Sequence, residues 1–233
     1  MQEIKDNIIA ISRHISDICV KKGKDPDNIT VIAVTKTVDT DRINYAINNG
    51  IRNIGENKVQ EIMAKYEKIE KNVNWHLIGH LQTNKVKYII DKVALIHSVD
   101  SIGLAEEISK RAGKAGIQKD VLMQVNVAQE ETKFGIEYEE IDSFAEQLSR
   151  FPGIRVKGLM TIAPYYEDTE QARPVFRRLK EKYDTLAAAG IPNVEMKYLS
   201  MGMTNDYVIA IEEGSNMVRI GTGIFGARNY DLL

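Results

Sequence analysis

A lysine ends a strand-like run of β-branched and small apolar residues at positions 30–36. Successive side chains of a strand point to opposite faces, so Ile32, Val34 and Lys36 share one face. If that face lines a core, the ammonium group of Lys36 lies at its rim. Such an ammonium is paired with a carboxylate, extends into solvent, or serves chemistry, because burial lowers the pKa of an amine and supplies a neutral nucleophile.

Two glycine-rich stretches, residues 200–206 and 221–226, each follow a predicted strand near the end of the chain. Small residues let backbone N–H groups approach an anion, and the hydroxyl groups of Ser200 and Thr222 can donate hydrogen bonds to it. Each stretch alone is typical of an ordinary turn. Their joint position after the last two strands predicts a phosphate-binding site.

Arg219 interrupts an otherwise apolar strand. If the first and last strands pair, Arg219 comes close to Lys36, and repulsion between the two cations favours the neutral amine. Alternatively, Arg219 pairs with a carboxylate such as Glu56 or Asp206 and is only structural. The sequence leaves both interpretations open.

Other chemistries are not favoured by the sequence. His76 and His80 fall on a predicted strand and its following loop, without an H-E-x-x-H motif, so we expect no metal site. A serine hydrolase is not favoured because the sequence contains no G-x-S-x-G motif.

The composition restricts the classes of partner and the compartment. The chain has 233 residues, with 31 Lys and Arg against 33 Asp and Glu, so its charge does not favour nucleic acid or an anionic membrane. Cys19 is the single cysteine, which excludes an internal disulfide. The chain contains neither a signal-like segment nor an apolar run long enough to cross a bilayer. We expect a cytoplasmic protein.

Strand-like and helix-like segments alternate along the whole chain without a linker. Eight strands joined by helices predict right-handed parallel crossovers and a closed barrel. We therefore predict an α/β protein with one domain over residues 1–233, a single (β/α)₈ TIM-type barrel whose additional N-terminal helix, residues 4–18, covers the gap left by the eighth helix. An open doubly wound sheet is less favoured because no G-x-G-x-x-G turn follows the first strand. The predicted strands are residues 30–36, 52–55, 73–79, 94–99, 121–127, 156–162, 194–199 and 217–223.

The lysine, the phosphate-binding loops and the arginine together suit pyridoxal 5′-phosphate (PLP). This cofactor needs an amine for its aldehyde, donors for its phosphate and a partner for its ring nitrogen. A Schiff-base aldolase acting on sugar phosphates would use the lysine and the loops, but it would not obviously need Arg219.

Several motifs in order along the chain resemble the pyridoxal phosphate homeostasis protein family. The resemblance covers nearly the whole chain, and it implies a barrel similar to the N-terminal domain of alanine racemase. The motifs are Val34-Thr35-Lys36, Ile54-Gly55-Glu56-Asn57, WHLIGHLQTNK at 75–85, Gly158-Leu159-Met160, LSMGM at 199–203 and VRIGTGIFG at 218–226.

The resemblance also implies the role of each site residue. Lys36 is implied as the lysine that forms an aldimine with PLP, and no residue is implied as catalytic. The residues implied around the cofactor are Asn57, Ser200, Met201, Arg219, Gly221 and Thr222. Thr204, where many relatives have serine, keeps the hydroxyl group.

The resemblance implies a non-catalytic protein of vitamin B6 homeostasis that influences amino-acid and keto-acid balance. Alanine racemases add a β-rich domain and a tyrosine base, whereas about ten residues follow the last strand motif here. An arginine at the ring nitrogen would also weaken the cofactor as an electron sink. We expect a monomer, with PLP-dependent apo-enzymes as partners. The alternative is a PLP-dependent amino-acid racemase or related PLP enzyme, with Tyr165 or His80 as the base.

Overall fold

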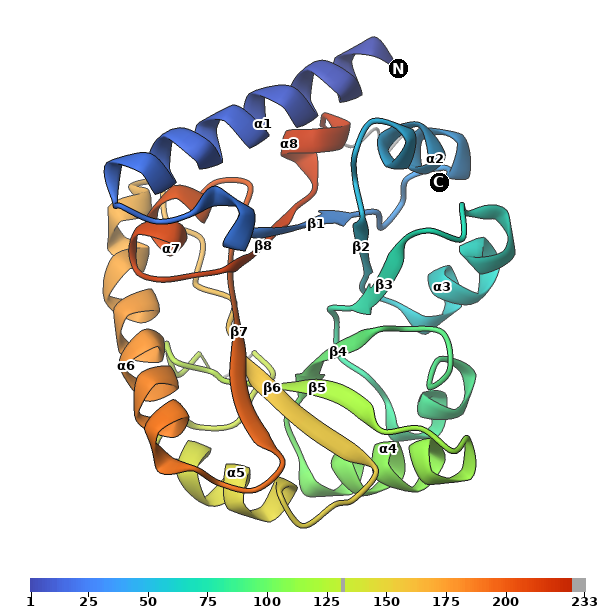
Figure 1. The fold of residues 1–233 in the computed structure, drawn as a ribbon, viewed down its shortest axis with the longest axis vertical. Coiled ribbons are helices and arrows are strands. Elements are labelled where there is room, and N and C mark those ends of the chain that lie inside the picture. The colour runs from blue at the N-terminus through green and yellow to red at the C-terminus, as the bar shows by residue number, and fades with distance from the viewer. Residues whose placement is uncertain (131–132, 228–233) are drawn as a thin grey trace.

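The computed structural model describes residues 1–130 and 133–227. Eight parallel strands close into a barrel in sequence order, with helices around the outside (Figure 1). The predicted (β/α)₈ barrel is therefore confirmed. The strands are β1 (Thr30–Val34), β2 (Asn53–Glu56), β3 (Asn74–Leu77), β4 (Leu95–Val99), β5 (Lys119–Gln124), β6 (Ile154–Met160), β7 (Val194–Met203) and β8 (Met217–Ile220).

Helices of several lengths connect and cover these strands. The α-helices are α1 (Gln2–Lys21), α2 (Thr40–Asn48), α3 (Val59–Lys65), α4 (Ile102–Lys114), α5 (Ile141–Leu148), α6 (Arg173–Ala189), α7 (Tyr207–Glu212) and α8 (Thr222–Phe225). The 3₁₀ helices are η1 (Pro26–Asn28), η2 (Tyr66–Lys68), η3 (Thr83–Tyr88), η4 (Tyr138–Glu140) and η5 (Thr169–Ala172).

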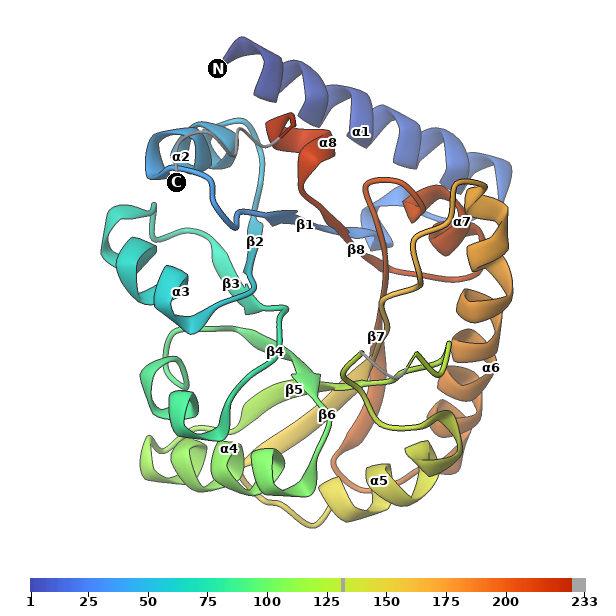
Figure 2. The ribbon, with the colours of Figure 1, turned by 180° about the vertical axis from the view of Figure 1, so that it is seen from behind.

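Helix α1 covers the side of the barrel where β8 meets β1. It packs against α7, α8 and α2, and both ribbon views show it lying across the outside of the barrel (Figure 2). Its isoleucines at helical spacing, Ile4, Ile8, Ile15 and Ile18, are buried in the core that surrounds the strands. Because α8 has only four residues, α1 supplies the cover that an eighth helix would otherwise give.

The strands separate two apolar layers. The outer layer lies between strands and helices, and it includes Phe176 on α6 and Ala33 on β1. A smaller layer inside the barrel contains Ile32, Leu95, Leu122, Met160 and Met217. The opposite locations of Ile32 and Ala33 follow from the alternation of side chains along a strand. Ile32 therefore points into the barrel.

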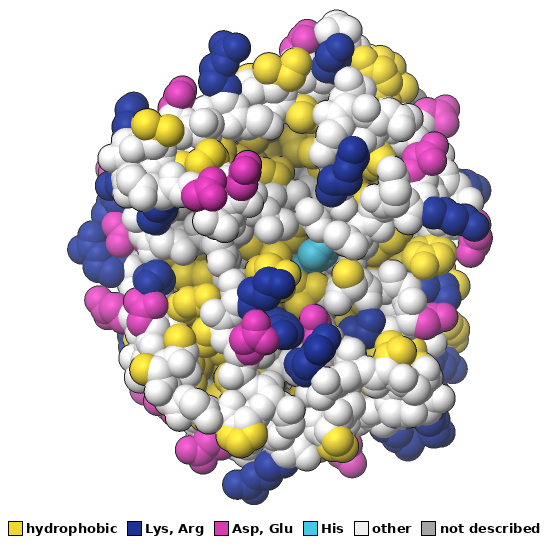
Figure 3. Space-filling view, in the orientation of Figure 1, with side chains coloured by type: hydrophobic (Ala, Val, Ile, Leu, Met, Phe, Trp, Pro, Cys, Tyr) yellow, Lys and Arg dark blue, Asp and Glu magenta, His cyan; other side chains and the backbone are white. Residues whose placement is uncertain are grey.

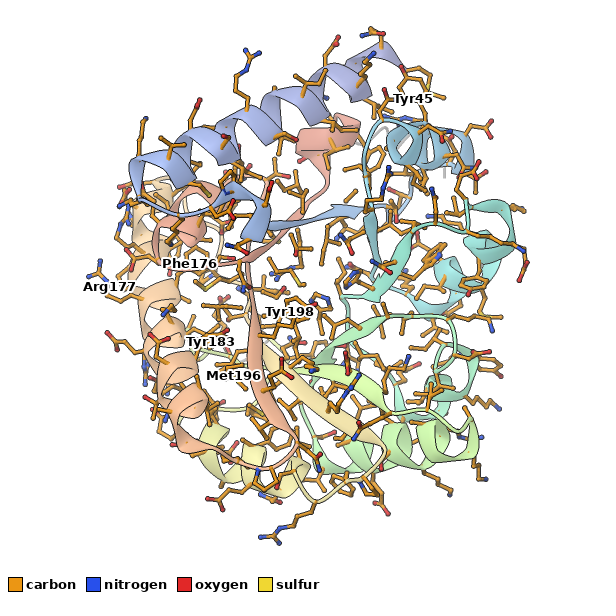
Figure 4. The ribbon with its side chains drawn as sticks, in the orientation of Figure 1. Tyr45, Phe176, Arg177, Tyr183, Met196 and Tyr198 are labelled. Atoms are coloured by element: carbon orange, nitrogen blue, oxygen red, sulfur yellow. The ribbon has the colours of Figure 1, made fainter. Side chains whose placement is uncertain are left out.

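Strand β7 contacts both the inner apolar layer and helix α6. Its Tyr198 packs against the inner apolar layer, and Figure 4 shows this label inside the barrel. Tyr183 on α6 donates a hydrogen bond from its hydroxyl group to the backbone oxygen of Met196 on the same strand. Helix α6 is thereby attached to β7 by a polar contact as well as by its apolar face.

Three local expectations differ from the structure. Strand β1 ends at Val34, so Lys36 lies in the turn that follows the strand. Strand β7 continues to Met203, so Ser200 and Met201 lie in a strand and not in the predicted loop. Strand β8 ends at Ile220, so Gly221 and Thr222 lie after the strand and not within the predicted strand at 217–223.

The surface agrees with the near balance of charges. On the face seen in Figure 3, Lys and Arg side chains alternate with Asp and Glu side chains, and neither sign gathers in one patch. Among the residues that the structure describes, no helix combines the length and the apolar character needed to span a bilayer.

Candidate cofactor-binding site

A cavity of about 400 Å³ lies where the loops after β1, β6, β7 and β8 meet. It is lined by Lys36, Arg219, Gly221 and Thr222, four of the seven residues implied as cofactor ligands. The volume is in the range of small-molecule sites, and the position at the carboxyl ends of strands is where barrels of this class bind ligands. Apolar walls come from Val34 and from residues 162–166.

Lys36 and Arg219 reach this cavity from adjacent strands. Strands β1 and β8 pair with Ile32 opposite Arg219, and Lys36 lies in the turn that follows β1. The predicted pairing of the first and last strands is confirmed. That the Lys36 amine is neutral stays a prediction.

Arg219 is held inside the barrel by uncharged partners. Its Nη1 donates to Ser200 Oγ at 2.6 Å, and its Nη2 donates to the backbone oxygen of Thr161 at 2.8 Å. Burial lowers the pKa of Arg219 to about 10, against the opposing charge of Asp206, so the side chain is still a cation at neutral pH. Two of its five N–H groups are used in these bonds, which leaves donors for a ligand in the cavity that it lines.

The alternative interpretation, an ion pair of Arg219 with Glu56 or Asp206, is not supported by the structure. Across residues 1–130 and 133–227, no carboxylate lies within 4.0 Å of the guanidinium nitrogens. Glu56 pairs with Lys65 at 2.8 Å, and Asp206 accepts a hydrogen bond from the backbone nitrogen of Met203 at 2.6 Å.

A line of buried hydrogen bonds continues from Ser200 through the barrel. Ser200 Oγ lies 3.1 Å from His97 Nδ1, His97 Nε2 lies 3.0 Å from His76 Nδ1, and His76 Nε2 lies 3.1 Å from Asn53 Oδ1. Burial lowers the pKa of His76 to about 4 and that of His97 well below its usual range, so both rings are neutral at pH 7.

The direction of these hydrogen bonds follows from Asn53, whose Oδ1 can only accept. His76 therefore carries its proton on Nε2 and accepts at Nδ1, and His97 does the same. Ser200 then donates its hydroxyl proton to His97 and accepts from Arg219. One consistent set of protons thus satisfies every member of this line, which runs from Arg219 to Asn53.

Sequence reasoning assigned no role to His97. The alternation of side chains along β4 could have identified it. His97 is two residues from the inward-facing Leu95, so it lies on the same, inner face. The same rule places Arg219 on the inner face with Met217.

The two glycine-rich stretches meet, as predicted. Thr204 Oγ1 accepts hydrogen bonds from the backbone nitrogens of Gly221 and Gly223, each at 3.3 Å. Gly202 in β7 has φ +93, and an added Cβ would lie 2.5 Å from the Cβ of Ala210, so this position requires glycine. Backbone N–H groups and two threonine hydroxyls, of Thr204 and Thr222, therefore gather at one side of the cavity.

The other implied ligands are placed differently. Ser200 is buried and acts on Arg219. Met201 is fully buried in the outer core, on the opposite face of β7 from Ser200. Asn57 follows β2, packs its backbone against Gly79 and is not among the residues that line the cavity. Their contacts with a cofactor stay predictions.

Tyr165 and His80, the two residues predicted as the base of an enzyme, have different surroundings. Tyr165 lines the cavity and is 80% exposed. His80 stacks on Phe134 with ring centroids 3.9 Å apart, and its Nδ1 lies 3.7 Å from Asp100 Oδ2. His80 and His76 do not come together, and the described part of the chain contains no cluster of three metal-binding side chains.

These features define the class of protein to which the chain belongs. The family described as "Alanine racemase, N-terminal domain" matches residues 4–229, so the chain is a member of this family of (β/α)₈ barrels. Within it, the chain belongs to the pyridoxal phosphate homeostasis proteins. It is 45% identical to the protein of that name from Aquifex aeolicus over 97% of this chain and 98% of the relative.

Two solved structures share this fold. A crystal structure of a protein from Bifidobacterium adolescentis is 38% identical, with a TM-score of 0.92 over 96% of this chain and 95% of the other. PipY of Synechococcus elongatus with PLP bound is 29% identical, with a TM-score of 0.83 over 96% of this chain and all of PipY.

Proposed function

We propose that this chain binds PLP in the cavity between β1 and β8, with Lys36 forming a reversible Schiff base, and that it serves cofactor homeostasis without catalytic turnover. The observation that carries the proposal is the meeting of Lys36, Arg219 and the Gly221–Thr222 turn around one cavity. The names of the relatives and the PLP-bound PipY structure support it.

The donors of the cavity fit the groups of the cofactor. PLP supplies an aldehyde that an amine can attack and a ring that can accept negative charge. Lys36 would provide the amine, Arg219 would donate to the ring nitrogen, and the hydroxyl groups of Thr204 and Thr222 would donate to the phosphate. Val34 and Ile162 would contact the ring and exclude water.

The charge of Arg219 supports binding without turnover. A guanidinium whose pKa is about 10 stays protonated, so it donates to a ring nitrogen and discourages protonation there. Weak electron withdrawal by the ring would slow the removal of a proton from a bound amino acid. The recipient apo-enzymes, the cytoplasmic location and the monomeric state remain predictions.

Borohydride reduction tests the covalent attachment. The purified chain incubated with PLP should develop a yellow absorbance that borohydride bleaches, and peptide mapping should place the reduced label on Lys36. Lys36→Ala should lose the label, while Lys114→Ala on the exposed end of α4 should keep it. Label on another lysine, or none, would contradict the proposal.

A second assay distinguishes the binder from a racemase. The loaded chain is incubated with L-alanine or L-serine, and the opposite enantiomer and the keto acid are measured over time. The proposal predicts no product above that of free PLP. Turnover at enzyme-like rates that is lost in Lys36→Ala would favour the racemase alternative, with Tyr165 as the first base to replace.

A further inference from the structure

The turn that carries Lys36 has an unfavourable backbone conformation. Thr37 has φ +63, in the left-handed region that β-branched residues rarely adopt. Such a conformation persists only where the surrounding structure holds it, and it recurs at functional sites. The contacts of the flanking residues, Thr35 and Thr37, show what holds it here.

Both residues that flank Lys36 are bound by groups from β2 and α3. The backbone nitrogen of Thr37 donates to Glu61 Oε2 at 2.9 Å, and Lys65 Nζ donates to the backbone oxygen of Thr35 at 2.9 Å. Thr35 also donates from its hydroxyl group to Glu56 Oε1 at 2.7 Å and from its nitrogen to the oxygen of Gly55 at 3.0 Å. The backbone is thus fixed on each side of Lys36.

The three charged residues form one network. Lys65 Nζ lies 2.8 Å from Glu56 Oε1 and 3.2 Å from Glu61 Oε2. The side chains of Lys65, Glu56 and Glu61 are 12%, 0% and 24% exposed, so water weakens these interactions less than it would those of a surface pair. Glu56 Oε2 is buried without a hydrogen-bond partner, which makes this carboxyl group depend on Lys65.

We propose that Glu56, Glu61 and Lys65 are positioning residues that hold the Thr35–Thr37 turn so that the Lys36 side chain enters the cavity. None of the three lines the cavity, so they act through the turn. A fixed turn leaves only side-chain torsions to be ordered when the Lys36 amine reacts, which favours attachment of the ligand. The effect on ligand attachment rests on the proposed function. The clamp, by which we mean Glu56, Glu61 and Lys65 with their hydrogen bonds to the turn, can be measured without a cofactor.

The test compares two substitutions of Glu61, because its side chain is the most exposed of the three charged residues. Glu61→Ala removes the acceptor of the Thr37 N–H group, whereas Glu61→Gln keeps an acceptor oxygen. Glu107→Ala is the matched control, because Glu107 also forms an i, i+4 ion pair on a helix, with Arg111 on α4.

In the first measurement, amide hydrogen exchange is followed in the cofactor-free chain. In Glu61→Ala the Thr37 amide should exchange about tenfold faster, as expected for loss of a hydrogen bond to a charged group. In Glu61→Gln the exchange rate should stay close to that of the parent. Glu107→Ala should not change exchange at Thr37. Unchanged exchange in Glu61→Ala would overturn the clamp.

In the second measurement, the initial rate of borohydride-trapped labelling at Lys36 is recorded at limiting PLP. Glu61→Ala should label about tenfold more slowly, with recovery in Glu61→Gln and parent behaviour in Glu107→Ala. An equal loss in Glu61→Ala and Glu107→Ala, or no recovery by glutamine, would overturn positioning. A parent chain that never labels would refute the proposed function instead, and hydrogen exchange would still decide on the clamp.

Discussion

Arg219 is a buried cation whose guanidinium group donates hydrogen bonds to a hydroxyl group and a backbone oxygen. An arginine inside a barrel must satisfy its donors, and here Ser200 and Thr161 accept two of them. Ser200 in turn is bound to His97. The orientation of the guanidinium therefore depends on a serine hydroxyl that both accepts and donates.

Ser200→Ala should destabilise the chain. It leaves Nη1 of Arg219 and Nδ1 of His97 without their shared partner, and each unsatisfied buried group costs about 1–3 kcal/mol. We expect the free energy of unfolding, measured by urea denaturation, to fall by about 2–6 kcal/mol.

Ser143→Ala is the control for this substitution. Ser143 is exposed on α5 and donates only to the backbone oxygen of Glu140. Its replacement should change the unfolding free energy by less than about 0.5 kcal/mol. Equal effects of the two serine variants would show that the line of hydrogen bonds through Ser200 does not stabilise the barrel.

At the scale of elements, strands β6 and β7 pair with a shift in register. Val156 pairs with Val194 and Gly158 with Tyr198, so β7 has extra residues between these pairs. Gly158 has φ +143, and an added Cβ would lie 1.7 Å from the backbone oxygen of Tyr198. The irregularity is therefore accommodated by a glycine on the neighbouring strand.

Gly158→Ala should be strongly destabilising. The substitution combines a strained backbone conformation with an overlap against a strand, each costing about 1–3 kcal/mol. We expect the unfolding free energy to fall by about 3 kcal/mol or more.

Gly113→Ala provides the contrast within a helix. Gly113 lies in α4, and an added Cβ meets nothing within 4 Å. Alanine should raise the unfolding free energy by about 0.5–1 kcal/mol because it is the better helix former. A Gly158→Ala variant as stable as Gly113→Ala would contradict the close approach of β6 and β7.

At the scale of the whole molecule, the buried histidines couple stability to pH. The pKa of His76 is about 4 in the folded chain, against an ordinary value of 6.5, and burial lowers the pKa of His97 further. The unfolded chain binds protons below pH 6.5 that the folded chain does not. This contribution to stability is complete above pH 6.5 and is lost as the pH falls toward 4.

Glu56 acts in the opposite direction. Burial raises its pKa to about 7, while its hydrogen bonds with Lys65 and Thr35 oppose the shift. Its contribution is complete below its ordinary pKa of 4.5 and is lost as the pH rises through 7. Between pH 4.5 and 6.5 unfolding lets the two histidines bind protons and lets Glu56 release one. Together these three groups should make the chain less stable as the pH falls, by at most about 1.4 kcal/mol per pH unit.

His76→Gln tests this assignment. Glutamine can accept from His97 and donate to Asn53, so the hydrogen bonds are kept while one titrating group is removed. Urea midpoints measured between pH 7.5 and 5 should fall less steeply in the variant than in the parent. Parallel pH profiles would exclude His76 as a source of the acid sensitivity.

Much of the architecture could be predicted from the sequence, because it depends on local geometry. The alternation of apolar segments predicts eight strands and seven crossovers, and the parity along β1 predicts that Lys36 shares a face with Ile32. The meeting of the loops after β7 and β8 follows from the barrel, since the carboxyl ends of parallel strands lie on one side. The strand limits in the structure differ from the predicted limits by a few residues, and the largest difference at one end is that of β7.

The sequence by itself determined the barrel, the face that Lys36 shares with Ile32 and the two glycine-rich stretches. Only the tertiary structure decided that Arg219 is bound by Ser200 and not by Glu56, that His97 lies against a serine 103 positions away, and that α3 holds the turn of Lys36. The physical reason is that side-chain alternation is a property of one strand. Contacts across the interior depend instead on the register between strands and on how the barrel closes.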